Sequence, residues 1–219
     1  MNIKGVIFDL DGTLLDSTEM WKGAAARYIM SLMKTPEPDI WEKTKDMTIP
    51  VLSHYLKEEY RIATTEDKIA RGFNTILREN YIESVDFNEY VPIVLEKYKQ
   101  RGVQMAITTS TAYHIVDEIL IRLGLRDYFK YIITTESTES KEHPQLFRDA
   151  LEALGTSIED TVVVEDGLIG IRTAKEAGLY VIAMHNEEYA DEEETIRQVA
   201  DEYIYSFKEL LKNRVGGNK

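Results

Sequence analysis

Cysteine is absent from this chain of 219 residues, which excludes disulfide bonds and thiolate zinc sites. The four histidines show none of the short spacings, such as His-x-x-x-His, with which two side chains hold one metal ion. Apolar runs are short, and none reaches the roughly 20 residues that a membrane-spanning helix needs. The start of the chain also lacks a basic segment followed by a signal-like apolar run, so we expect a soluble, cytoplasmic protein.

Basic residues are outnumbered, with 26 Lys and Arg against 39 Asp and Glu, which gives a net charge of −13. Such a chain is repelled by nucleic acid and by anionic membranes, so we expect neither as a partner. Much of the excess lies in residues 186–194 (NEEYADEEE), a composition typical of a solvated helix start or loop. An anionic substrate would approach against this charge. Any phosphate site must therefore be made locally positive by a metal ion and a well-placed lysine.

Five short apolar segments are typical of buried strands, and amphipathic helical patterns lie between them. The strands are predicted at residues 5–10, 103–108, 131–134, 161–164 and 180–184. The helices are predicted on the face of Ile115, Ile119 and Leu123 before Gly124, from Pro144 to Leu154 before Gly155, and from Ile169 to Ala177 before Gly178. Alternation of this kind predicts an α/β fold with a doubly wound, mostly parallel sheet and helices on both faces.

Residues 18–87 break this alternation. They contain no convincing strand and read as consecutive amphipathic helices, with Trp21, Tyr28 and Ile29 on one early face. We therefore predict two domains: residues 1–17 and 88–219 form the α/β core, and residues 18–87 form an inserted helical domain.

The first predicted strand runs directly into two aspartates, Asp9 and Asp11, followed by Gly12. Side chains two apart in a strand point to the same side, and the glycine lets the backbone turn. Asp-Gly alone is a common turn signal. Two carboxylates that converge at the end of a buried strand, however, need a bound hard cation or a shared proton to offset their repulsion.

The next three strand ends also carry polar side chains, in the order Thr109-Ser110, Lys141 and Glu165-Asp166. Each alone is typical of a helix cap, a surface lysine or an acidic turn. In a doubly wound sheet, however, ligands bind beyond the carboxyl ends of the strands, where these residues would meet. Carboxylates, hydroxyls and a lysine are what metal-dependent phosphoryl transfer needs, because the phosphate dianion repels an attacking carboxylate. Magnesium fits an all-oxygen ligand set.

The string from Asp9 to Ser17 (DLDGTLLDS) resembles motif one of the haloacid dehalogenase superfamily of phosphatases and phosphomutases. The three later motifs follow in order at Thr109, Lys141 and Asp166. The helical insertion and residues 162–179 (VVVEDGLIGIRTAKEAGL) are similar to the subgroup that contains phosphoglycolate phosphatase and β-phosphoglucomutase. The resemblance implies a Rossmann-like core with a small α-helical cap.

The resemblance also implies a role for each motif residue. Asp9 would be the nucleophile and a metal ligand, and Asp11 the general acid and base whose main-chain carbonyl also reaches Mg²⁺. Thr109, with Ser110, would bind the phosphoryl group, and Lys141 would pair with that group and with Asp9. Asp166 would be a metal ligand, with Glu165 in a supporting position behind it. Four cap residues are weaker candidates for substrate specificity: Glu19, Trp21, Arg78 and Tyr81.

Two departures from the family pattern bear on function. Relatives usually read Gly-Lys-Pro-x-Pro-Asp around the lysine, whereas this chain reads Ser-Lys-Glu-His-Pro-Gln at residues 140–145, without the first proline and the aspartate. Relatives of the β-phosphoglucomutase type generally carry a histidine near Trp21 and an arginine near Ile49, and both are missing here. Their absence favours hydrolysis over mutase chemistry.

We therefore expect a monomeric, magnesium-dependent phosphatase that hydrolyses a small phosphorylated metabolite through an aspartyl-phosphate. A phosphomutase is the nearest alternative. A haloacid dehalogenase is disfavoured because relatives of that kind usually lack the aspartate at position Asp11. A phospho-accepting regulatory domain would share the acids, threonine and lysine, but such domains are shorter and lack the helical insertion.

Overall fold

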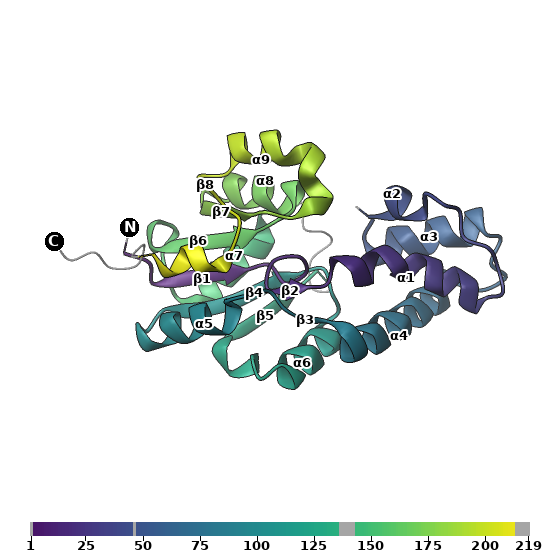
Figure 1. The fold of residues 1–219 in the computed structure, drawn as a ribbon, viewed down its shortest axis with the longest axis horizontal. Coiled ribbons are helices and arrows are strands. Elements are labelled where there is room, and N and C mark those ends of the chain that lie inside the picture. The colour runs from purple at the N-terminus through teal and green to yellow at the C-terminus, as the bar shows by residue number, and fades with distance from the viewer. Residues whose placement is uncertain (1, 46, 136–142, 213–219) are drawn as a thin grey trace. The chain divides into compact units, whose positions relative to one another are not determined.

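The computed structural model describes residues 2–45, 47–135 and 143–212 (Figure 1). Contacts divide them into two compact units, residues 1–16 with 86–219 and residues 17–85. The assignment of these units as a catalytic core and a cap stays a prediction. No helix in the described part of the chain is both long enough and apolar enough to cross a membrane.

A six-stranded parallel sheet forms the centre of the larger unit, in the order β5-β4-β1-β6-β7-β8. Its strands are β1 (Gly5–Phe8), β4 (Gln104–Thr109), β5 (Tyr131–Thr134), β6 (Thr161–Glu165), β7 (Tyr180–Met184) and β8 (Glu202–Ile204). The predicted α/β class and parallel sheet are confirmed. The edge strand β8 was not predicted, because three residues are too few to show a periodic pattern.

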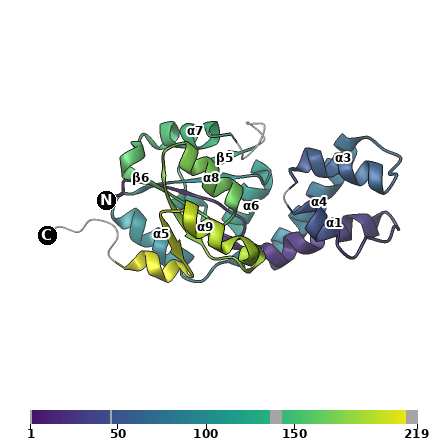
Figure 2. The same cartoon turned by 90° about the horizontal axis from the view of Figure 1, so that it is seen from above.

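Helices cover both faces of this sheet. They are α5 (Val91–Gln100), α6 (Tyr113–Arg122), α7 (Gln145–Leu154), α8 (Leu168–Glu176) and α9 (Glu193–Val199). One face packs on α7, α8 and α9 through Phe147, Ile171 and Ile196, and Figure 2 shows these three helices over the sheet. On the other face Phe8 of β1 packs against Tyr98 of α5 at 6.4 Å between ring centroids. Apolar side chains therefore pack against both faces of the sheet.

Helix α7 shows how local sequence sets these boundaries. The prediction placed Pro144 as the first helical residue, and the structure places it one position earlier, as the N-cap. The helix buries Leu146, Phe147 and Ala150 on one face, as its apolar spacing predicts. It ends at Gly155, whose φ of +69° is the left-handed conformation that glycine adopts without strain.

The smaller unit contains α1 (Thr18–Ser31), α2 (Ile40–Thr44), α3 (Ile49–Glu59) and α4 (Glu66–Ser84). Its interior is aromatic: Tyr28 meets Phe73 edge to face at 6.2 Å, and the Trp21 indole donates a hydrogen bond to the Tyr81 hydroxyl at 3.1 Å.

The prediction of no strand within residues 18–87 is wrong at its end. The two-residue strand β3 (Asp86–Phe87) pairs antiparallel with β2 (Leu15–Asp16). A ladder this short carries no periodic signal.

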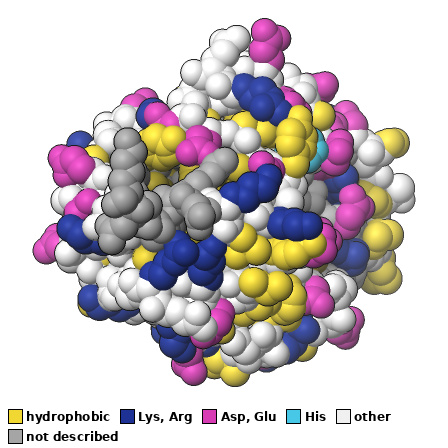
Figure 3. All heavy atoms as spheres, turned by 60° about the vertical axis from the view of Figure 1, so that its left-hand side comes forward, with side chains coloured by type: hydrophobic (Ala, Val, Ile, Leu, Met, Phe, Trp, Pro, Cys, Tyr) yellow, Lys and Arg dark blue, Asp and Glu magenta, His cyan; other side chains and the backbone are white. Residues whose placement is uncertain are grey.

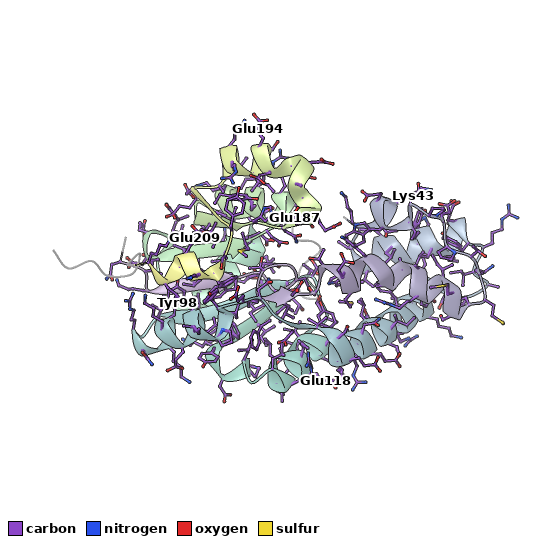
Figure 4. The ribbon with its side chains drawn as sticks, in the orientation of Figure 1. Lys43, Tyr98, Glu118, Glu187, Glu194 and Glu209 are labelled. Atoms are coloured by element: carbon purple, nitrogen blue, oxygen red, sulfur yellow. The ribbon has the colours of Figure 1, made fainter. Side chains whose placement is uncertain are left out.

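Acidic and basic side chains are interspersed on one face of the molecule. Figure 3 shows Lys and Arg side chains among Asp and Glu side chains on the face that it displays. The acidic segment forms the 3₁₀ turns η3 (Glu187–Glu192) and then α9, and Figure 4 labels Glu187 and Glu194 on it. Both of these side chains are exposed to solvent.

Candidate active site

The loop that follows β1 is closed by its own backbone. All four residues of β1 are buried, and Asp9 directly after them is only 1% exposed. Two main-chain hydrogen bonds fold the next residues into a tight turn, from the Gly12 N–H to the Leu15 carbonyl at 3.0 Å and from the Leu15 N–H to the Leu10 carbonyl at 2.9 Å. Gly12 has a φ of +82°, which strongly favours glycine at this position.

Three buried acids gather at the carboxyl ends of β1 and β6. Asp9, Glu165 and Asp166 each offer a carboxylate oxygen, and these oxygens lie within 4.8 Å of one another. Strand register brings them together: Phe8 pairs with Val164, and the Asp9 N–H donates to the Val164 carbonyl at 2.9 Å. Buried like charges repel one another strongly in a medium of low dielectric constant. A divalent cation with oxygen ligands offsets this repulsion, so the donor set fits such an ion.

The Asp166 carboxylate is fixed through both of its oxygens. The Thr13 hydroxyl donates to Oδ1 at 3.1 Å, and the Asn186 amide nitrogen donates to Oδ2 at 2.7 Å. A Cβ on Gly12 would overlap Oδ2 of Asp166, so the loop after β1 can approach this acid only with glycine there. The side chain is therefore held in one orientation by two donors from distant parts of the chain.

Glu165 is held by the turn between β6 and α8. Its Oε1 accepts from the main-chain N–H groups of Asp166 at 3.3 Å and Gly167 at 3.2 Å. Its Oε2 lies against Gly170 in α8, where a Cβ would overlap it. One glycine in the helix thus makes room for a buried carboxylate.

Asp11 has different surroundings from Asp9. It is only half-buried, and its Oδ2 accepts from the Thr111 hydroxyl at 2.7 Å. The Thr111 N–H in turn donates to the Thr109 hydroxyl oxygen at 3.1 Å, which links the loop after β4 to the loop after β1. Thr109 is buried, and Ser110 is half-buried. Asp9 therefore lies in the acid cluster, whereas Asp11 lies beside the Thr111 hydroxyl.

Residues 6–184 match the family model of haloacid dehalogenase-like hydrolases. The chain belongs to this family. The resemblance inferred from the motifs is thereby confirmed. The hydrolase is 29% identical to a phosphorylated carbohydrates phosphatase of Thermotoga maritima over 187 residues, which cover 81% of this chain and 82% of that protein.

Two further comparisons extend this result. The hydrolase is 30% identical to a phosphoglycolate phosphatase of Neisseria meningitidis over 183 residues, covering 81% of this chain and 78% of the relative. Among solved structures, CbbY from Rhodobacter sphaeroides in complex with phosphate has the same fold, with a TM-score of 0.81 at 24% identity. That match covers 95% of this chain and 96% of CbbY.

The hydrolase thus brings most of the predicted core residues to one edge of its sheet. Asp9, Glu165 and Asp166 form the acid cluster, and Asp11 and Thr109 are linked through Thr111. Glu165 contributes one oxygen to the cluster, and its supporting position behind Asp166 stays a prediction. Lys141 lies outside the described residues, so its part in the site stays a prediction.

The four cap candidates all belong to the helical unit. Glu19 pairs with Lys22 at 2.7 Å, and Arg78 is exposed on α4. Tyr81 is fully buried and accepts the hydrogen bond from Trp21, as a side chain of the unit's interior does. Their contribution to specificity stays a prediction.

Sequence reasoning missed two residues of the site, Thr111 and Asn186. Thr111 lies two positions after Thr109 and could have been found by following the motif into the loop. Asn186 follows β7, the fifth predicted strand, and lies two residues beyond its end. An uncharged amide within an acidic segment gave no separate signal.

Gly170→Ala is expected to displace Glu165, because the new methyl group overlaps its carboxylate. We expect a loss of about 1–3 kcal/mol in the free energy of unfolding, as for overpacking elsewhere, and weaker binding of a divalent cation. Gly23→Ala in α1 is the matched control, since the three atoms nearest to its methyl group all belong to the flexible end of Arg27. That variant should stay within about 1 kcal/mol of the parent. Urea unfolding and Mn²⁺ titration of both variants provide the measurement, and equal losses would contradict this role for Gly170.

Proposed function

We propose that this hydrolase is a magnesium-dependent phosphatase that hydrolyses a small phosphorylated metabolite through an aspartyl-phosphate on Asp9. The observation that carries the proposal is the buried cluster of Asp9, Glu165 and Asp166 at the carboxyl edge of the sheet. The names of the relatives support the substrate class, because they are phosphatases of phosphorylated carbohydrates and of phosphoglycolate.

Asp9 and Asp166, two of the three acids in the cluster, would hold the ion. The family resemblance adds the main-chain carbonyl of Asp11 to them. When bound, Mg²⁺ supplies the positive charge that lets a carboxylate approach a phosphate dianion. The remaining chemistry belongs to the chain. An Asp9 oxygen attacks phosphorus, the bond to the ester oxygen breaks, and Asp11 gives its proton to the leaving alkoxide. Thr109 holds the phosphoryl oxygens during this step.

The second step uses Asp11 as a base. Its carboxylate takes a proton from a water molecule, the water oxygen attacks phosphorus, and the bond to Asp9 breaks to release inorganic phosphate. The different surroundings of the two aspartates support this division of roles. Asp9 lies in the acid cluster beside the proposed ion, whereas Asp11 is half-buried and held by the Thr111 hydroxyl.

Phosphate release from a panel of substrates tests the proposal. The panel contains p-nitrophenyl phosphate, phosphoglycolate, hexose and hexitol phosphates, glyceraldehyde 3-phosphate and pyrophosphate, each measured with Mg²⁺ and with EDTA. We expect Mg²⁺-dependent release from at least one of them. Release that is no faster with Mg²⁺ than with EDTA would refute the proposal.

The same panel separates the alternatives. A sugar 1-phosphate that is isomerised without release of free phosphate would favour the phosphomutase. A phosphorylated Asp9 that persists for minutes would favour a regulatory phospho-acceptor over an enzyme.

A further inference from the structure

The uncharged side chain of Asn186, just after β7, contacts the acid cluster. The Asn186 amide nitrogen donates to Oδ2 of Asp166 at 2.7 Å, while its amide oxygen accepts from the Glu188 N–H at 3.0 Å. A main-chain N–H can only donate and an ionised carboxylate can only accept. These two partners therefore fix which end of the amide faces Asp166.

Three separate segments of the chain meet at the Asp166 carboxylate. Thr13 comes from the loop after β1, Asp166 follows β6, and Asn186 follows β7. Gly12 completes the contact, because a Cβ there would overlap Asp166 and lie 2.7 Å from the Asn186 amide nitrogen. Packing this close leaves the carboxylate little freedom to rotate.

The strand end that carries Asn186 is itself anchored to β8. The His185 N–H donates to the Ile204 carbonyl at 2.8 Å, and His185 Nδ1 lies 2.9 Å from the Tyr203 hydroxyl. The amide is thus held from the sheet on one side and from η3 on the other.

We propose that Asn186 is a positioning residue that fixes the Asp166 carboxylate for binding of the divalent cation. This inference rests on the proposed metal-dependent function. A donor to a carboxylate oxygen fixes the direction in which the side chain offers its oxygens to the ion. Partners of this kind behind a ligand typically change metal affinity by about 10-fold to 100-fold when they are removed. In this proposal the acidic segment 186–194 contributes to the ion site through the side-chain amide of Asn186.

Asn186→Ser separates the two hydrogen bonds of this side chain. Serine is as good an N-cap as asparagine, so its hydroxyl can still accept from the Glu188 N–H. The serine side chain is shorter than that of asparagine, so a hydroxyl that stays beside the Glu188 N–H does not reach Asp166 to donate to it. We expect the dissociation constant for Mn²⁺, measured by electron paramagnetic resonance on the protein without substrate, to rise about tenfold. The Mg²⁺ concentration for half-maximal activity should rise by a similar factor.

Ser206→Ala is the matched control. The Ser206 hydroxyl caps η4 (Phe207–Leu211) by accepting from the Lys208 N–H at 3.2 Å, just as Asn186 caps η3. Its loss should lower the melting temperature and leave Mn²⁺ affinity unchanged. An Asn186→Ser variant that binds Mn²⁺ like the parent, or a Ser206→Ala variant that weakens binding as much, would overturn the inference while the proposed function stands. A parent protein that binds no Mn²⁺ and releases no phosphate would instead overturn the proposed function, and this inference with it.

Discussion

Asp9→Asn should reduce phosphate release by roughly 10⁴-fold or more, the scale of effect that removal of a nucleophile has in other enzymes. The substitution keeps the size of the side chain but replaces the attacking carboxylate by an amide. It also replaces one of three buried acidic side chains whose oxygens lie within 4.8 Å of one another. We therefore expect the metal-free variant to melt at a temperature no lower than that of the parent, because repulsion in the cluster is reduced.

Steady-state kinetics at saturating Mg²⁺ and thermal melting in EDTA together check this prediction. Asp127→Asn makes the same chemical change at an exposed position in the 3₁₀ turn Arg126–Tyr128 and should leave both quantities unchanged. If Asp9→Asn kept more than a few per cent of the parent rate, another group would have to be the nucleophile.

Asp166→Ala should raise the Mg²⁺ concentration for half-maximal activity by about 100-fold or more. A direct ligand should matter at least as much as the outer partners, whose removal costs about 10-fold to 100-fold. The substitution also leaves the donors Thr13 and Asn186 without their acceptor. Activity over a wide range of Mg²⁺ concentrations gives the size of the shift, and Mn²⁺ binding to the free protein gives it independently of catalysis.

Glu165→Gln provides the comparison for that variant. Glutamine can still accept from the main-chain N–H groups of Asp166 and Gly167, so the turn after β6 is preserved while one charge is lost. Its shift should be smaller than that of Asp166→Ala. Unchanged metal dependence in Asp166→Ala would place the ligand elsewhere in the chain.

The central sheet could be predicted because its strands are short, continuous apolar runs. The prediction for Tyr131–Thr134 and that for Tyr180–Met184 match the observed strands, and β1 ends two residues earlier than the predicted segment. The short strands β3 and β8 could not be found in this way. These strands form because the rest of the fold places a neighbouring strand beside them, and a local sequence pattern contains no information about that neighbour.

The acid cluster could be predicted for a related reason. Parallel strands in register end at the same level, so polar residues after β1 and β6 had to meet. The roles of Thr111 and Asn186 could not be predicted, because they depend on the direction that a loop takes and on one side-chain orientation. Spacing along the sequence also does not reveal that Glu165 lies within the cluster.

The hydrogen bond between Thr13 and Asp166 joins residues 153 positions apart, and it has a consequence for biosynthesis. A ribosome adds about 5–20 residues per second, so roughly 8 to 30 s pass between the emergence of these two partners. During that interval the nascent chain has β1 but not β6, so its first aspartates lack the acids that complete the proposed ion site. That proposed site therefore cannot form until translation has passed residue 166 and β6 has docked beside β1.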